Sequence, residues 1–271
     1  MIKKTLLLCG LLFGLLTSAD AQTGGAVPDN VMDLSVLQGY RTHSGTHMAA
    51  LRIQLKPGWK TYWRAPGDGG IPPQFDWSGS QNIKAVTFHW PSPKVAFVNG
   101  LRTIGYMDEV IIPIEFSLRS KTGPTSLKGR VDLGICKDIC VPMSVAFAAA
   151  LPKNSTKPDP LIRAALKKVP IPAAKAGVKN VMCTIEPISD GLRVTATLTL
   201  PAMGGKEVTV IEAPDQSIWV SEATTKRVGN TLTATSEMVP PSNAPFLLER
   251  SNIRITVIGS NHAVDILGCT G

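Results

Sequence analysis

The feature that most constrains this chain is a period of two in its apolar residues. In segment 49–56, leucine and isoleucine at every second position alternate with polar side chains, and the same alternation runs through 110–118 and 127–135. Successive side chains of a β-strand point to opposite faces, so this period indicates strands with one buried face. Short strands separated by loops rich in Pro and Gly, such as 64–73 and 90–93, are typical of a β-sandwich.

The alternation stops in segment 153–177, which is rich in proline. Asp159 is suited to cap a helix whose first residue is Pro160, and Pro170 would stop that helix. The apolar positions that give the helical spacing are Leu161, Ala165 and Val169. We therefore expect a linker that contains one short helix.

Alternation resumes after the linker, in segments 192–200 and 253–257. The sequence Gly259-Ser260-Asn261 predicts a hairpin turn that leads into a strand at 263–267. We therefore predict an all-β chain of two sandwich domains. Their expected bounds are 22–152 for the first domain, 153–177 for the linker and 178–271 for the second domain.

Residues 1–21 have the pattern of a cleavable secretory signal. Lys3 and Lys4 precede an apolar stretch at 6–16, and Ala19-Asp20-Ala21 is a small-x-small cleavage site, so the mature chain is expected to begin at Gln22. Later segments do not reach the length of apolar sequence that a membrane-spanning helix needs. We expect export to the periplasm, where cysteines tend to be oxidised.

The charge balance is 28 basic against 20 acidic residues, a formal net charge of +8. The basic residues are scattered, in runs of no more than two. Nucleic-acid binding surfaces have basic residues clustered on one element, so we do not expect nucleic acid as a partner.

Four cysteines remain after the expected signal, and four cysteines allow three pairings. Pairing Cys136 with Cys140 and Cys183 with Cys269 keeps both members of each pair within one predicted domain. The second pair would close a long loop and stabilise the fold by about 4–5 kcal/mol through the lower entropy of the unfolded chain, so we predict a structural disulfide. A second redox pair or a thiol shared between chains is the alternative.

Cys136 and Cys140 need a turn between them in order to bond. Four extended steps span about 13 Å, whereas the Cα atoms of a disulfide lie within about 7 Å. The chain must therefore turn at 137–139. The parity of strand 127–135 places Cys136 on the polar face, which predicts solvent access for its thiol.

A ring this short stabilises a fold little, by about 1.5–2 kcal/mol. Short, exposed disulfides tend to be labile ones, which favours a redox role. Short-spaced cysteines also serve as structural bridges and as metal ligands, and both alternatives stay open. A closed zinc site needs four ligands and no histidine lies nearby in the sequence, but Cu(I) suits thiolates.

The surroundings of this pair resemble a known family. The matching stretches are Pro57-Gly58-Trp59-Lys60-Thr61-Tyr62-Trp63-Arg64, Pro66-Gly67-Asp68-Gly69-Gly70-Ile71-Pro72-Pro73, Phe75-Asp76-Trp77-Ser78-Gly79-Ser80, Trp90-Pro91-Ser92-Pro93, Ile104-Gly105-Tyr106, Val110-Ile111-Ile112-Pro113 and Ile135-Cys136-Lys137-Asp138-Ile139-Cys140-Val141-Pro142. Over about residues 35–150, the chain resembles the N-terminal periplasmic domain of the DsbD family of protein-disulfide reductases. The second half more weakly resembles the longer periplasmic region of some members, including the ScsB-like branch linked to copper tolerance.

The resemblance implies an immunoglobulin-like fold in which Cys136 and Cys140 shuttle electrons as a dithiol–disulfide pair. In the family, a membrane domain regenerates the dithiol, which then reduces periplasmic partner proteins. Four further residues would shield the pair, with packing of the sandwich core as their alternative role: Tyr62, Trp63, Tyr106 and Pro142.

These 271 residues contain neither the multi-span membrane domain nor a thioredoxin-like domain with Cys-x-x-Cys. We therefore expect a component of a protein-disulfide reductase, which needs no cofactor and takes electrons from a separate membrane donor. Its expected partners are thioredoxin-fold or disulfide-bearing proteins of the periplasm. The alternative function is a module that binds copper or a redox partner without turnover of its own.

Overall fold

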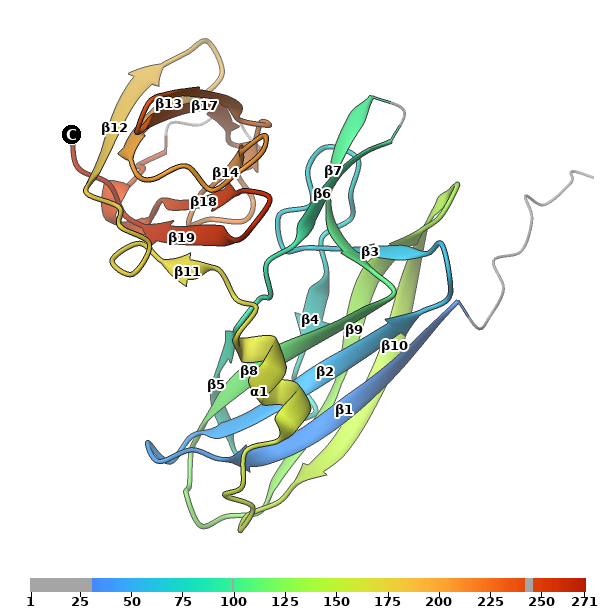
Figure 1. Ribbon diagram of the computed structural model, residues 1–271. Helices are drawn as coiled ribbons and strands as arrows, with labels where there is room; N and C mark the ends of the chain where they lie inside the picture. Colours follow the sequence, from blue (N-terminus) through green and yellow to red (C-terminus); the bar gives the residue numbers. More distant parts are fainter. Residues whose placement is uncertain (1–30, 99, 242–245) are drawn as a thin grey trace, which may run out of the picture.

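The computed structural model describes residues 31–98, 100–241 and 246–271, so the expected signal at 1–21 lies outside the described residues. The prediction of an all-β, immunoglobulin-like architecture is confirmed. The described residues form nineteen strands, one α-helix and one 3-10 helix, arranged as two sandwiches (Figure 1). No helix among the described residues is long and apolar enough to cross a membrane.

The first sandwich comprises two antiparallel sheets. One sheet has the order β1 (Met32–Arg41), β2 (His47–Leu55), β8 (Glu109–Leu118) and β5 (Ile83–Phe88). The other has the order β10 (Cys140–Leu151), β9 (Thr125–Cys136), β3 (Lys60–Tyr62), β7 (Leu101–Met107) and β6 (Lys94–Val98), with β4 (Gln74–Asp76) also paired to β9.

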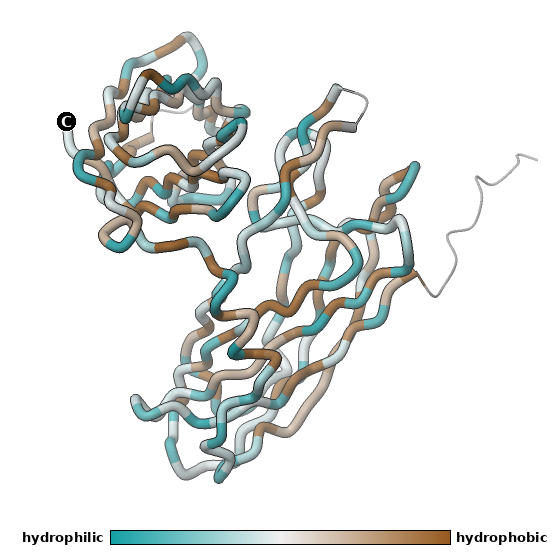
Figure 2. The backbone as a smooth tube through the Cα atoms, in the orientation of Figure 1, coloured by the Kyte–Doolittle hydropathy of each residue, from teal (hydrophilic) through white to brown (hydrophobic). Residues whose placement is uncertain are grey.

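The core of this sandwich lies between the alternating apolar faces of its two sheets. Ile112, Ile114 and Phe116 of β8 are buried, as are Leu133 and Ile135 of β9. Brown and teal therefore alternate along the strands in Figure 2. A slip of one residue would turn these apolar side chains outward, so the burial fixes the register of β8 and β9.

The short helix α1 (Pro160–Leu166) begins where the sequence predicts. The side chain of Asp159 accepts hydrogen bonds from the backbone N–H groups of Leu161 and Ile162. The predicted apolar face is wrong in part, because Leu161 is 43% exposed while Ile162 and Ala165 are buried. Ile162 packs into a small cluster beside Met48 and Ala50 of β2, so tertiary contact, rather than the spacing from Leu161, selects the buried face.

The second sandwich also comprises two sheets. One has the order β11 (Ile171–Pro172), β19 (Ala263–Leu267), β18 (Arg254–Ile258) and β14 (Val208–Glu212). The other has the order β12 (Asn180–Pro187), β13 (Leu192–Thr199), β17 (Thr231–Val239) and β15 (Trp219–Val220), with β16 (Thr224–Val228) paired to β17. The 3-10 helix spans Arg250–Asn252.

A disulfide joins the beginning and the end of the chain segment that forms the second sandwich. Cys183 of β12 bonds to Cys269, which follows β19. The predicted hairpin turn at 259–261 is confirmed, since Ile258 of β18 faces Ala263 of β19 across it. The disulfide therefore joins the first long strand of this sandwich to the segment after its last strand.

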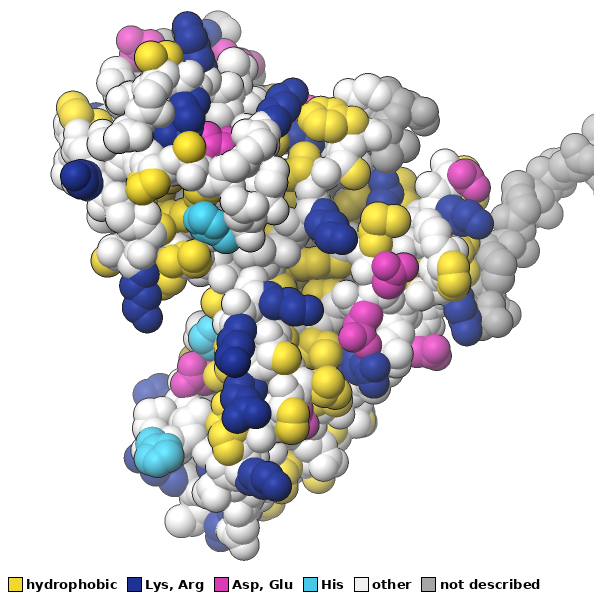
Figure 3. Space-filling model, viewed as in Figure 1, with side chains coloured by type: hydrophobic (Ala, Val, Ile, Leu, Met, Phe, Trp, Pro, Cys, Tyr) yellow, Lys and Arg dark blue, Asp and Glu magenta, His cyan; other side chains and the backbone are white. Residues whose placement is uncertain are grey.

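Charged side chains are spread over both sandwiches on the face that Figure 3 shows. Lys and Arg side chains lie among apolar and uncharged surface, and several of them lie around α1. In the same view the two sandwiches meet through a continuous surface, with an open notch between them on the left.

We predict that the two disulfides differ in their effect on stability. Replacing Cys183 and Cys269 together by Ala should lower the free energy of unfolding by about 4–5 kcal/mol, because that bond closes a long loop. Replacing Cys136 and Cys140 together by Ala should cost only about 1.5–2 kcal/mol. Urea denaturation of the two double variants measures both losses, and equal losses would contradict the prediction.

Candidate functional site

The cysteine pair closes the hairpin formed by β9 and β10. Cys136 is the last residue of β9, Cys140 is the first of β10, and the two face each other directly in the ladder. They form a disulfide with their Cα atoms 4.2 Å apart. The predicted turn at 137–139 is confirmed, and it carries Lys137, Asp138 and Ile139 as exposed residues.

The disulfide lies at the end of a row that crosses the sheet. Lys60 of β3 pairs with Cys136 on one side and with Met107 of β7 on the other. Directly paired residues present their side chains on the same face, so Lys60 shares the face of the sulfurs. Its Nζ atom donates a hydrogen bond to Thr103 Oγ1 at 3.4 Å and lies 6.0 Å from the centre of the Tyr62 ring. Burial lowers the pKa of Lys60.

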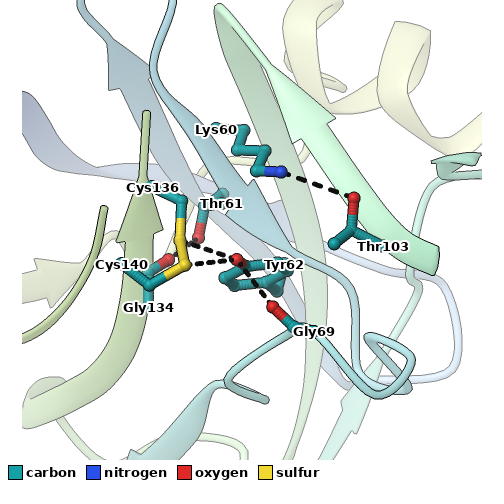
Figure 4. The surroundings of a disulfide bond; sticks show 8 residues. All are labelled: Lys60, Thr61, Tyr62, Gly69, Thr103, Gly134, Cys136 and Cys140. Carbon is teal, nitrogen blue, oxygen red and sulfur yellow. Dashed lines mark hydrogen bonds between the residues drawn. A yellow bond between two sulfur atoms is a disulfide. The ribbon is translucent and has the colours of Figure 1, made fainter. Parts of the chain in front are cut away.

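Tyr62 is the closest polar group to the sulfurs (Figure 4). Its hydroxyl oxygen lies 2.7 Å from Cys136 Sγ and 3.1 Å from Cys140 Sγ, and the hydroxyl donates to the Gly69 carbonyl at 3.1 Å. Burial raises the pKa of Tyr62, so the hydroxyl keeps its proton at neutral pH. A hydroxyl has one proton to donate, and Tyr62 must therefore divide it between the Gly69 carbonyl and sulfur.

The two cysteines differ in exposure. Cys140 is exposed, whereas Cys136 is only 1% exposed, so the prediction of solvent access for Cys136 is wrong. Strand parity predicts which face carries Cys136, but it does not predict which groups cover that face. Tyr62 and the loop that follows it lie over it, and a Cβ atom added at Gly134 would stand 2.7 Å from Ile71 Cβ.

Two of the other three predicted shields lie in the core, and the shielding role of the third, Pro142, stays a prediction, since it stands two residues after Cys140 opposite Gly134. Trp63 and Tyr106 are buried members of the core cluster, and Tyr106 donates a hydrogen bond to the Pro91 carbonyl at 2.8 Å. Pro142 is exposed at the start of β10. Neighbours on a strand face opposite ways, so Tyr62 and Trp63 cannot both face the sulfurs. Their alternative role as core residues holds for Trp63 and Tyr106.

Sequence reasoning missed two groups that belong to this site. Lys60 stands two residues before Tyr62, so strand alternation alone would have placed both on one face. The position of the Gly69 carbonyl could not be predicted in this way, because Gly69 lies in a loop and a loop has no periodic pattern of residues. Among the described residues, no three His, Cys, Asp or Glu side chains gather as a metal site would need.

Comparison with known proteins relates this chain to a family and to a solved structure of similar fold. Residues 31–152 match the family described as thiol:disulfide interchange protein DsbD, N-terminal. The crystal structure of the N-terminal periplasmic domain of ScsB from Proteus mirabilis matches with a TM-score of 0.66 and 24% sequence identity, over 91% of this chain and 96% of that chain. This likeness shows that the two proteins share a fold over nearly their whole lengths.

Two further comparisons add no argument. A marsupial T cell receptor matches with a TM-score of only 0.19 and 9% identity, over 89% of this chain and 96% of that chain. A comparison with curated proteins found no match.

We predict that the Tyr62 hydroxyl promotes thiolate chemistry. In the reduced protein, Tyr62→Phe should slow alkylation by iodoacetamide at neutral pH about three- to tenfold, because a hydrogen bond to a charged group is lost. Phe keeps the ring that covers Cys136, so access changes little.

Tyr106→Phe is the matched control, since it removes a buried hydroxyl on the opposite face of the same sheet. Its alkylation rate should equal that of the unaltered protein. Equal rates for the Tyr62 and Tyr106 variants would contradict the prediction.

Proposed function

Residues 31–152 form a domain of the DsbD N-terminal family, and on that premise we propose that the chain exchanges electrons with other proteins through Cys136 and Cys140. The observation that carries the proposal is the asymmetry of the pair. Cys140 is exposed at the end of the hairpin, while Cys136 is buried against the Tyr62 hydroxyl. An exchange site needs one accessible sulfur and a second sulfur held in reach of the first.

Cys140 is the cysteine that meets the partner. In the reduced protein its thiolate attacks one sulfur of a partner's disulfide, and the partner's S–S bond breaks as the new S–S bond forms. The other partner sulfur leaves as a thiolate and takes up a proton from solvent. The product is a mixed disulfide between Cys140 and the partner.

Cys136 resolves this intermediate. Its thiolate attacks Cys140 Sγ, the bond to the partner breaks, and the Cys136–Cys140 disulfide closes. The second partner sulfur leaves as a thiolate and is protonated, so the partner gains two electrons and two protons. Because the hairpin holds the Cα atoms 4.2 Å apart, the resolving sulfur starts beside its target.

Two groups assist the thiolates in this scheme. The Tyr62 hydroxyl can turn its proton from the Gly69 carbonyl toward a thiolate, and Lys60 brings a positive charge to the same face. Both a hydrogen-bond donor and a nearby cation stabilise a thiolate.

The partners we propose are thioredoxin-fold or disulfide-bearing proteins of the periplasm, with a separate membrane protein as electron donor. The family match supports a thiol-redox partner, and the solved structure of similar fold is described as a periplasmic domain. The exposed turn at 137–139 lets a partner approach Cys140 from the end of the hairpin.

Glutathione disulfide tests the roles of the two cysteines. Reduced Cys136→Ser protein should form a lasting glutathione adduct at Cys140, roughly tenfold or more faster than Cys140→Ser forms one at Cys136, because only Cys140 is exposed. The unaltered reduced protein should form the internal disulfide and keep no adduct. Mass spectrometry of intact protein follows all three reactions.

An adduct that persists on the unaltered protein would contradict the resolving role of Cys136. Equal rates in the two single variants would contradict the assignment of Cys140 as the cysteine that meets the partner.

A further inference from the structure

The loop 64–73, here called the cover loop, holds Tyr62 in place. Its Gly69 carbonyl accepts the Tyr62 hydroxyl, and a Cβ atom added at Gly70 would stand 2.8 Å from Cδ1 of the Tyr62 ring. Ile71 follows directly and lies against Gly134 of β9. A movement of the cover loop would therefore change both the position of Tyr62 and the cover over Cys136.

The second sandwich reaches this loop through Glu222, which lies between β15 and β16. One carboxylate oxygen of Glu222 accepts the backbone N–H of Asp68 at 3.5 Å. The other lies 3.1 Å from Nε of Arg102, whose side chain is only 9% exposed. Arg102 belongs to the hairpin of β6 and β7, which rises beside the second sandwich (Figure 1). Glu222 thus bridges the cover loop and this hairpin.

The cover loop and the hairpin also touch each other where Glu222 meets them. A Cβ atom at Gly67 would stand 2.7 Å from the Arg102 carbonyl oxygen and 3.3 Å from Glu222 Oε1. Gly67 has φ +79°, a conformation that other residues rarely adopt. This close approach needs glycine and leaves the loop tip against the carboxylate.

A second ion pair anchors the start of the loop to the same sandwich. Arg64 donates two hydrogen bonds of 2.9 Å to the carboxylate of Glu212, and a third of 3.1 Å to Thr256 Oγ1. The side chains of Arg64 and Glu212 are 15% and 21% exposed. Bidentate pairs of this kind combine charge with fixed geometry, so Arg64 sets where the loop begins.

Beside the loop lies a cleft of about 1240 Å³ between the sandwiches. Gly67, Asp68 and Gly70 line one side, and Glu212 and Glu222 line the other. The cover loop therefore has space to move toward the second sandwich if its contacts to Glu222 are lost.

We propose that Glu222 is a positioning residue of the exchange site, through which the second sandwich holds the cover loop over Cys136 and keeps Tyr62 against the sulfurs. This inference rests on the proposed function of Cys136 and Cys140. It gives the second sandwich a role in the chemistry, because the path from its carboxylate to the sulfurs runs through Asp68, Gly69 and Tyr62.

Reduction of the full-length disulfide form by dithiothreitol tests the inference. Glu222→Ala should speed reduction of the Cys136–Cys140 disulfide about fivefold, the factor for a loop contact of about 1 kcal/mol. The displaced loop lets dithiothreitol attack Cys136 Sγ, and the solvent-exposed Cys140 sulfur then leaves as a thiolate without help from Tyr62. Glu222→Gln keeps an acceptor for the Asp68 N–H and should have a smaller effect. The matched control is Glu237→Ala, which removes an exposed carboxylate paired with Arg193 in the same sandwich.

An Arg102→Gln variant and the Glu222→Ala/Arg102→Gln double variant complete a cycle. The double variant should react no faster than Glu222→Ala alone, because both changes break one bridge. Urea denaturation shows whether each variant is folded at the temperature of the assay, so that a faster rate is not due to unfolding.

A reduction rate in folded Glu222→Ala and in the double variant equal to that of Glu237→Ala would overturn the inference. The glutathione experiment tests the proposed function separately, because the cysteine variants keep the contacts of Glu222 with Asp68 and Arg102. Normal adduct formation there with no effect of Glu222 would overturn the positioning role alone.

Discussion

The direct pairing of Cys136 with Cys140 at the end of the β9–β10 ladder is the constraint on which the site depends. Twelve consecutive residue pairs fix this register, from the cysteines to Leu151 opposite Thr125. Once the register is fixed, alternation sends Ile135 into the core and the sulfurs to the other face. Lys60 shares that face through its pairing with Cys136, and the Tyr62 hydroxyl reaches both sulfurs there.

The two disulfides of the chain have different physical consequences because they close loops of different length. The Cys183–Cys269 bond spans 86 residues and greatly restricts the unfolded chain, whereas the Cys136–Cys140 bond spans four and restricts it little. The short bond is also the one with an exposed cysteine and a hydroxyl beside its sulfurs. We therefore propose that the long bond serves stability and that the short bond serves thiol–disulfide exchange.

Periodicity and turn chemistry predicted much of this structure. The strand faces, the turn at 137–139, the hairpin at 259–261 and the cap at Asp159 all follow from local patterns, because strands and caps are set by nearby residues. The exposure of Cys136 could not be predicted in this way. It depends on a loop from another part of the chain, and the path of a loop has no period.

The prediction of the residues that shield the sulfurs had the same limit, because it did not include the three-dimensional path of the chain. Tyr62 and Trp63 lie more than 70 residues before Cys136 and were predicted as shields from the family resemblance, and only strand parity separates Tyr62 on the sulfur face from Trp63 in the core. Glu222 lies more than 80 residues from Cys136, in a different sandwich, and its contact with the cover loop appears only in three dimensions. Parts of the site that depend on long-range contacts of this kind cannot be predicted from local sequence patterns.

Electron exchange at this site requires that biological thiols can break and remake the Cys136–Cys140 bond. Equilibrating the protein in dithiothreitol buffers of defined ratio, and measuring the fraction of free Cys136 and Cys140 thiols by mass spectrometry, gives the reduction potential of this bond. An exchange site predicts a potential above about −300 mV, within the range of known thiol–disulfide carriers. A potential below about −300 mV would place the bond among inert structural disulfides and would contradict the account.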